Sequence, residues 1–326
     1  MAGVGAQLFQ PPVTLVNTMN GWTQKYFQPI LADSIFRPSP TYWRITRLGK
    51  KIDGGGGLVW SVITTEETTG GSYYGVQVLD TSITDSAVPA ELNWKFYQQA
   101  ISIPVTDLLM NAGRGNVIDL VKGKEEIAMG SLLQKLARAI YGVSPQNTST
   151  DIDSLPSALA ASGSYANITL SATTGWLSNG TLGPAVGAGT NNIGLATMQT
   201  DYGNATFGNE EPDTAIMTQT GFNAFWALLT VNQRYFDEET TRAGFKNHLM
   251  FNNAVVLHDQ FTPSGEMYFL TSKYIKPIFM EQDYFRVDPF LQPTNQRVMI
   301  SHIWLALNVQ LLTLRQHSRR TTLTNG

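Results

Sequence analysis

The chain has 326 residues, of which 42% are hydrophobic and only 14% are charged, and its net charge is −3. This length allows a large buried core, and the absence of cysteine excludes disulfides, zinc–thiolate sites and thiol catalysis. The nearly neutral charge argues against a basic nucleic-acid-binding face. No apolar run reaches the roughly 20 residues of a membrane helix, and the start carries no secretory signal. We therefore expect a protein that is made in the cytoplasm and does not enter a membrane.

Residues 1–50 are expected to form an extended arm. Five prolines block long helices in this region, at Pro11, Pro12, Pro29, Pro38 and Pro40. The spacing of apolar residues allows one short amphipathic helix at 22–33. The arm ends in the basic run RITRLGKK at 44–51.

The next segment, 51–94, is predicted to be a two-stranded ribbon. Side chains alternate in LVWSVI at 58–63 and in YYGVQV at 73–78, with Gly70-Gly71 as the turn between them. Four glycines at 54–57 indicate a hinge at the base. An isolated hairpin is marginal in water and needs a surface to lie on. Either the rest of this chain or a second copy supplies that surface.

A strand at 95–106 is followed by a long helix at 116–141. Apolar residues recur at steps of four and seven along this helix, at Val117, Val121, Ala128, Leu132, Leu136 and Ile140. Asn116 is the expected N-cap, and Gly142 is the expected stop. Gly123 and Gly130 weaken the interior of the helix, so neighbouring elements are expected to support it along its length.

The segment 145–211 is rich in Ser, Thr, Asn and Gly and is expected to consist of loops with short elements. A strand at 214–218 then leads into a helix with Thr220 as its N-cap.

The last third of the chain is predicted to be strands. Two strands at 252–261 and 265–275 are expected to join through the turn Pro263-Ser264-Gly265. A long strand with one apolar face follows at 300–316. The basic tail beyond it is expected to fray.

No motif predicts catalytic chemistry. Three acidic clusters lie among polar residues and match no calcium-loop spacing, at Asp151/Asp153, Glu210/Glu211 and Asp237/Glu238/Glu239. The four histidines form no paired-ligand pattern, and His258 and Asp259 are adjacent on a strand and should point to opposite faces. The glycines at 54–57 precede a strand rather than a helix, which is the wrong context for a phosphate loop. We expect neither an enzyme nor a bound metal or cofactor.

The ribbon is one-sided in charge. Residues 52–94 contain six Asp and Glu but no Lys or Arg, whereas basic residues lie just before the ribbon and on the long helix. This arrangement favours docking between opposite charges, and a merely solvated acidic loop is the alternative. The predicted loop contacts, with aromatic residues as anchors, are Trp60, Glu66, Glu67, Tyr73 and Tyr74. The predicted basic partners are Arg44, Arg47, Lys50, Lys51, Lys122, Lys124 and Arg138.

The order of these elements resembles that of the major capsid proteins of tailed bacteriophages, which have the Hong Kong 97-type fold. Three stretches carry the most specific likeness. PDTAIMTQTGFNAFWAL at 212–228 resembles the family's strand-then-helix segment in the axial domain, and NNAVVLHDQFTPSGEMYFLTSKYI at 252–275 resembles the strand pair after it. RVMISHIWLALNVQLLTLRQHSRRTTL at 297–323 resembles the C-terminal strand and basic end.

The resemblance implies an α+β fold with five parts: an N-terminal arm at 1–50, an extended loop at 51–94, a peripheral domain at 95–144 with a spine helix at 116–141, an axial domain at 145–285, and a return to the peripheral domain at 286–326. It also implies a shell subunit that assembles as hexamers and pentamers into an icosahedral virion capsid in the host cytoplasm. Such a shell encloses double-stranded DNA without reading its sequence. The neighbouring subunit would supply the surface on which the ribbon rests.

Two departures from the family's pattern matter. Some members cross-link subunits through a Lys in the extended loop, and no Lys is present there, so this chemistry is not expected. Some members carry a long helical scaffolding segment that a protease removes, and its absence here implies a separate scaffolding protein or an already processed chain. A portal and a decoration protein are further candidate partners.

Two alternatives stay open. One is the shell of a cellular nanocompartment with the same fold, which would differ in its cargo. The other, from a different class, is a carbohydrate-binding or hydrolytic β-rich protein that uses Trp60, Tyr73, Tyr74 and the acidic clusters.

Overall fold

The computed structural model describes residues 39–67, 69–76, 78–83, 85–110, 114–170, 176, 185–187, 193–229, 249–321 and 323. The chain divides into two compact units. The described parts of the first unit are 98–110, 114–132 and 287–303, and those of the second are 39–97, 133–170, 176, 185–187, 193–229, 249–286, 304–321 and 323. The helix predicted at 22–33 lies outside the described residues.

A six-stranded sheet in the second unit has the order β7-β15-β11-β8-β10-β9. Its central strand β8 is buried along its whole length and pairs in parallel with β10 and antiparallel with β11. The strands are β7 (Ala185–Gly187), β8 (Thr214–Met217), β9 (Leu249–Phe251), β10 (Ala254–His258), β11 (Met267–Leu270) and β15 (Ser318–Arg320).

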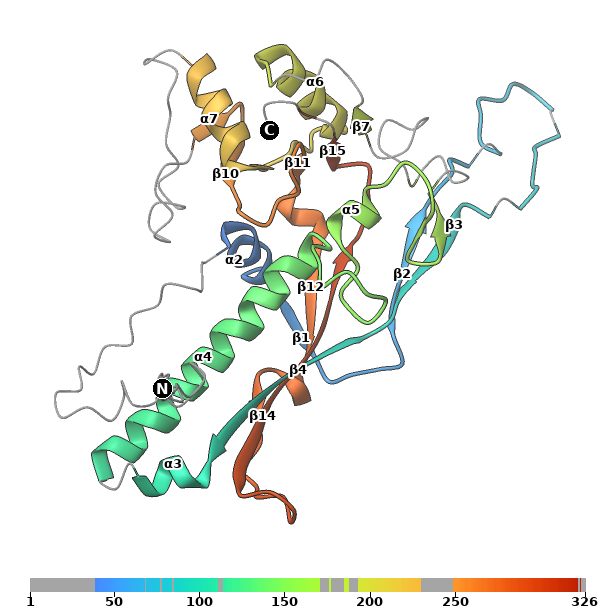
Figure 1. The fold of residues 1–326 in the computed structure, drawn as a ribbon. Coiled ribbons are helices and arrows are strands. Elements are labelled where there is room, and N and C mark those ends of the chain that lie inside the picture. The colour runs from blue at the N-terminus through green and yellow to red at the C-terminus, as the bar shows by residue number, and fades with distance from the viewer. Residues whose placement is uncertain are drawn as a thin grey trace, which may run out of the picture. The chain divides into compact units, whose positions relative to one another are not determined.

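Helices α6 (Leu195–Ala205) and α7 (Gln219–Leu228) pack on this sheet (Figure 1). Met198 and Phe225 on the helices are buried against Met217, Val256 and Phe269. These three alternate along their strands with residues of the sheet's other face, which are buried too. A strand buries a given face through every second residue. The helices therefore cover one face of the sheet and close its core.

Two details of this region correct the prediction. Strands β10 and β11 do not pair with each other, because β8 lies between them. The predicted turn does form, since the Glu266 backbone N–H donates to the Pro263 carbonyl, but it connects strands that are not neighbours. The N-cap of α7 is Thr218, whose hydroxyl accepts from the Gly221 backbone N–H, and not Thr220.

A second sheet contains β1 (Lys50–Ile52), β12 (Ile275–Met280), β14 (Val298–Leu311) and β13 (Arg286–Val287) in that order, and β4 (Lys95–Pro104) also pairs with β14. The predicted strands at 95–106 and 300–316 are confirmed over 95–104 and 300–311, whereas 105–106 begin α3 and 312–316 are not strand. The predicted apolar face of β14 is buried, but the prediction did not include the burial of Asn308 and Gln310 on its other face. Asn308 tolerates burial because its amide donates to the Asn93 carbonyl at 2.8 Å and to the Asp153 carboxylate at 3.1 Å.

The C-terminal tail does not fray at 318–320. Strand β15 lies between β7 and β11, parallel to the first and antiparallel to the second. Ion pairs make this placement possible for a basic sequence. Arg320 pairs with Asp201 on α6, and Arg319 pairs with Glu266. Each buried charge is thereby matched by an opposite charge.

The long helix is α4 (Arg114–Ile140), preceded by the short helix α3 (Val105–Met110). Ala128, Leu132, Leu136 and Ile140 are buried, which confirms the predicted stripe for these residues. Asn116 lies inside the helix and is not its N-cap. Gly142 ends it as predicted with a φ of 58°, and the Gly142 and Val143 N–H groups donate to the Ala139 and Arg138 carbonyls. This bonding pattern is a Schellman motif.

Residues 39–50, the described part of the predicted arm, form helix α2 (Pro40–Thr46) and begin β1. The Ser39 hydroxyl caps the helix and donates to the buried Asp259 carboxylate. The Thr41 hydroxyl lies 2.7 Å from the Tyr141 hydroxyl. Residues 39–46 are therefore held against the body of the second unit.

The described part of 145–211 has the short elements that its composition predicts. They are α5 (Leu155–Ala158), β5 (Ser164–Tyr165), β6 (Ile168–Thr169) and β7, and the longer helix α6 lies in this segment as well. The turns η3 (Ser272–Tyr274) and η4 (Glu281–Asp283) lie later in the chain. The Tyr165 hydroxyl bonds to both the Val309 carbonyl and the Leu311 N–H. This segment is thus tied to β14.

Candidate inter-subunit surface

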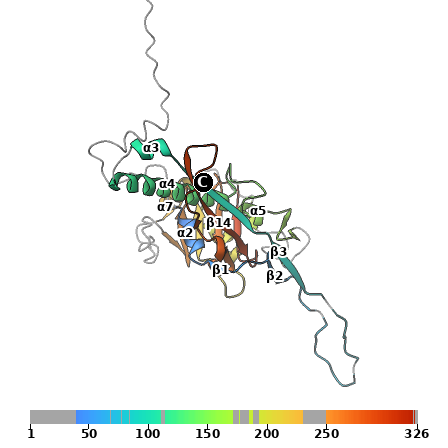
Figure 2. The same cartoon turned by 90° about the horizontal axis from the view of Figure 1, so that it is seen from below.

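The ribbon consists of β2 (Leu58–Ile63) and β3 (Ala87–Leu92), paired antiparallel from Leu58↔Leu92 to Ile63↔Ala87 (Figures 1 and 2). The predicted second strand at 73–78 was wrong, because no strand occurs among the described residues of 64–86. The ladder closes where the Thr64 N–H donates to the Ser86 carbonyl. The alternating side chains at 73–78 did not identify the second strand of the ribbon, because a strand also needs a partner strand in register.

The base of the ribbon rests on its own chain. Leu58, Val62, Ala90 and Leu92 are buried. The Trp60 indole N–H donates to the Leu312 carbonyl at 3.3 Å. The base of the ribbon is therefore supported by the second unit of its own chain. A surface for the rest of the ribbon is not supplied by these contacts.

The loop between the two strands, 64–86, is exposed and apolar at its tip. Tyr74, Val76, Val78 and Ile83 are each at least 95% exposed, and Tyr73 is 69% exposed. Figure 2 shows the loop running away from β2 and β3. Large apolar side chains that gather in one exposed segment mark an interaction site.

The loop's acidic residues lie in solvent. Glu66 is exposed, and Glu67 accepts from the Ser86 hydroxyl at 2.7 Å. Asp80 accepts from the Ser82 hydroxyl and backbone N–H, and these hydrogen bonds lower the pKa of its carboxyl. The described part of the loop thus presents negative charge beside an apolar tip.

The predicted basic partners fall into two groups. Some lie against their own chain: Arg44 contacts Asp213, Arg47 lies over the Trp43 ring, Lys51 lies 3.6 Å above the Tyr284 ring, and Arg138 lies over Phe261. The other three lie on β1 and α4: Lys50 and Lys122 are exposed, with Lys122 4.0 Å from Glu126, and Lys124 is half-buried. Exposure does not separate the two groups, since Arg47 and Lys51 are exposed as well.

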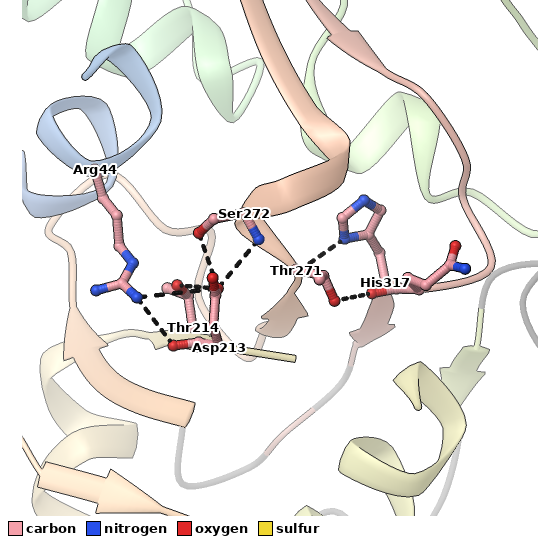
Figure 3. Close-up of polar contacts among 7 residues, drawn as sticks. Arg44, Asp213, Thr214, Thr271, Ser272 and His317 are labelled. Atoms are coloured by element: carbon pink, nitrogen blue, oxygen red, sulfur yellow. Dashed lines mark hydrogen bonds and ion pairs between the residues drawn. The ribbon is translucent and has the colours of Figure 1, made fainter. Parts of the chain in front are cut away.

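Arg44 belongs to a polar junction shown in Figure 3. Its guanidinium donates to the Asp213 carbonyl at 3.1 Å, while the Asp213 carboxylate accepts from the Thr214 hydroxyl and from the Ser272 hydroxyl and N–H. These bonds link α2, β8 and η3. Sequence reasoning missed this role, because Arg44 and Asp213 are far apart in the chain.

Buried His317 lies in the same view (Figure 3). Its Nδ1 accepts from the Thr271 backbone N–H at 3.2 Å, and the Thr271 hydroxyl donates to the Gln316 carbonyl. Burial lowers the pKa of His317 to about 3. The imidazole is therefore neutral near pH 7 and acts as a structural acceptor.

The other polar residues considered from the sequence are also placed structurally. Asp259 accepts from the Phe261 N–H, while the pKa of half-buried His258 is lowered by burial, and its ring packs on Phe222. Glu210 pairs with Lys273, and residues 237–239 lie outside the described part. Within the described residues, no group of three His, Asp or Glu is placed to hold a metal. No helix there has the length and apolar character needed to span a membrane.

Comparison with known proteins shows which solved structures this architecture resembles. No protein-family model matches the chain, and no curated protein sequence matches it. The capsid asymmetric unit of cyanophage A-1(L) is 14% identical, with a TM-score of 0.67 over 91% of this chain and 96% of that one. The capsid of a native GTA particle is 10% identical, with a TM-score of 0.60 over 95% and 99%.

An encapsulin is also similar. The holo-SrpI encapsulin complex of Synechococcus elongatus PCC 7942 is 10% identical, with a TM-score of 0.50 over 90% of this chain and 92% of that one. At such low identities these likenesses concern the fold. The chain has the α+β fold of phage capsid subunits, as predicted from the order of its elements: the Hong Kong 97-type fold.

Proposed function

We propose that this protein is the major capsid protein of a tailed double-stranded DNA bacteriophage. Copies assemble as hexamers and pentamers into an icosahedral virion shell, in the host cytoplasm, and enclose the genome without sequence recognition. A separate scaffolding protein, a portal and a decoration protein are the further partners of this assembly. The observation that carries the proposal is an apolar, exposed loop tip on a subunit with the fold of capsid proteins.

The loop tip gains free energy by docking on a second copy. Burying a Val or Ile side chain fully contributes about 1.5–3 kcal/mol, and Val76, Val78 and Ile83 are almost completely exposed in the single chain. Glu66 and Glu67 guide the contact toward basic residues such as Lys50, Lys122 and Lys124 of the neighbour. Trp60 contributes less to this contact than Tyr73 and Tyr74, since its ring lies against its own chain.

The test removes the loop and keeps its base. Residues 65–85 are replaced by Asn-Gly, which joins Thr64 to Ser86 where the strand pairing ends through a two-residue turn that suits a hairpin. The shortened protein should unfold at the same temperature as the full chain but form no closed shells by electron microscopy. Normal shells from it would refute the role of the loop.

A matched pair of surface variants separates tip chemistry from general solubility. The triple change Tyr74→Ser, Val76→Ser and Val78→Ser should reduce the yield of shells, whereas Leu195→Ser, at an apolar residue 42% exposed on α6, should not. Equal yields would contradict the proposal.

The contents of the particles decide between a virion and a nanocompartment. Nuclease-protected DNA supports the capsid, and protein cargo supports the nanocompartment that the encapsulin likeness suggests. Glycan binding by a monomer would instead favour the carbohydrate-binding alternative.

A further inference from the structure

We infer that Trp60 is a positioning residue, which fixes the direction of the extended loop from within its own subunit. The inference rests on the proposed function only where it concerns assembly. It starts from the contrast between the two ends of the ribbon: the side chains at the base are buried in the second unit, and those at the loop tip are exposed.

Trp60 is a side-chain link between ribbon and body, beside the Glu91 backbone N–H that donates to the Ala166 carbonyl at 3.0 Å. Its ring centroid lies 6.5 Å from that of Trp176, which is fully buried and stacks on Tyr165 at 6.2 Å with an 18° angle between the planes. The Tyr165 hydroxyl is fixed in turn by two backbone groups of β14. A row of three aromatic rings thus connects β2 to the second sheet.

The indole N–H of Trp60 adds direction to this contact. It donates to the Leu312 carbonyl, just beyond the end of β14. Ring packing resists displacement of the ribbon, and a hydrogen bond of fixed geometry resists its rotation. Neighbouring Val59 and Ile63 point the other way and are 64% and 77% exposed, so they supply no such restraint.

The connections at the base do not fix the direction by themselves. One connection is glycine-rich: Gly54 and Gly55 have φ values of 123° and 131°, which glycine adopts without strain. A hydrogen bond holds this connection, since the Trp94 indole N–H donates to the Gly55 carbonyl at 3.0 Å. The other connection, at Asn93, is held by Asn308. These supports and the Glu91 N–H bond to Ala166 lie no farther along the ribbon than the pair Val59↔Glu91, whereas Trp60 contacts the body at the next pair, Trp60↔Ala90.

Small tilts at the base become large movements at the tip. At about 3.3 Å per residue, the end of β2 lies roughly 10 Å from Trp60, so a tilt of about 30° moves it by about 5 Å. The loop continues beyond the end of β2, so its tip moves farther than this. Such a displacement separates the tip from any single site on a neighbouring copy.

The experiment measures the direction of the ribbon in the unassembled subunit. The chain has no cysteine, so spin labels can be placed at Ile63→Cys on β2 and Ala196→Cys on α6 without other changes. Pulsed electron resonance then gives the distance distribution for wild type, Trp60→Ala, Trp60→Phe and the control Val59→Ala. We expect a shift or broadening of about 5 Å for Trp60→Ala, a smaller one for Trp60→Phe, and none for Val59→Ala.

Identical distributions for Trp60→Ala and Val59→Ala would overturn the inference. If Trp60→Ala does not fold, as judged by circular dichroism, Trp60→Phe decides: a broadened distribution supports the inference and an unchanged one overturns it. In a second arm, shell yield should fall for Trp60→Ala and not for Val59→Ala. Absence of shells in wild type, with the distance change intact, would contradict the proposed function alone.

Discussion

The buried ion pair between Asp201 and Arg320 gives the sharpest stability prediction. The Arg320 guanidinium contacts both carboxylate oxygens of Asp201, at 2.5 and 2.7 Å, and the two side chains are only 8% and 2% exposed. Burial raises the pKa of Asp201, although the bond to Arg320 and its charge act in the opposite direction. The pair thus compensates a large desolvation cost rather than adding net stability.

Asp201→Asn removes one partner and leaves the guanidinium buried without its counter-charge. Breaking a buried pair in this way costs about 3–5 kcal/mol, a large part of the roughly 5–15 kcal/mol that stabilises a typical domain. The double variant Asp201→Leu with Arg320→Met replaces both charges by apolar groups. Its free energy of unfolding should return to within about 1–2 kcal/mol of wild type.

The assay is equilibrium unfolding of the subunit in urea, followed by circular dichroism. Glu210→Gln serves as the control, because it breaks the exposed pair with Lys273 and should leave the midpoint unchanged. A cost below about 1 kcal/mol for Asp201→Asn would mean that β15 is not seated between β7 and β11, and the reasoning would fail.

Two further predictions concern single residues. His317 has a pKa of about 3 when folded against 6.5 for a free imidazole, so the unfolded chain binds a proton that the folded one does not, and stability falls as the pH drops below 6.5. His317 alone should contribute a loss of about 2 kcal/mol between pH 7 and pH 5. The total loss should be smaller by about that amount in His317→Asn, which keeps an acceptor for the Thr271 N–H, and equal losses in both proteins would contradict this. Gly55→Ala should destabilise the ribbon base by about 1–3 kcal/mol because its φ is 131°, whereas Gly56→Ala, where an added Cβ meets nothing within 4 Å, should be neutral. Equal amide exchange rates of β2 in the two variants would show that Gly55 is not constrained.

The elements with strong local signals could be predicted from the sequence. In α4 the apolar stripe and the stop at Gly142 are local signals, because each depends on residues close together in the chain. The sequence pattern alone therefore predicts most of this helix. The long strand β14 was predicted for the same reason, because its alternation extends over many residues. Its second buried face could not be predicted, since the partners of Asn308 lie at Asn93 and Asp153.

The elements that depend on distant partners were missed. Strand β15 reads Ser-Arg-Arg, which is unfavourable in a core until Asp201 and Glu266 are brought beside it. The second ribbon strand contains Pro89, which usually argues against a central strand, yet it pairs with Ser61 in a two-stranded ribbon. The local preference of a residue for strand structure predicts a strand poorly where pairing with a distant segment determines whether the strand forms.

The candidate surface was predictable in part. The lack of Lys and Arg in the ribbon and its aromatic residues led to the prediction of a docking element; Tyr73 and Tyr74 are exposed, and the docking itself stays a prediction. The sequence did not reveal that Trp60 faces its own subunit or that Arg44 contacts Asp213. Both facts depend on contacts between segments far apart in the chain.

Electron microscopy of the purified protein at high concentration tests the central claim most directly. If the protein is a capsid subunit, we expect closed shells, or rings of five and six subunits, in which the loop 64–86 of each copy lies on a neighbour. A preparation that contains only monomers, with this loop folded onto its own body, would contradict it.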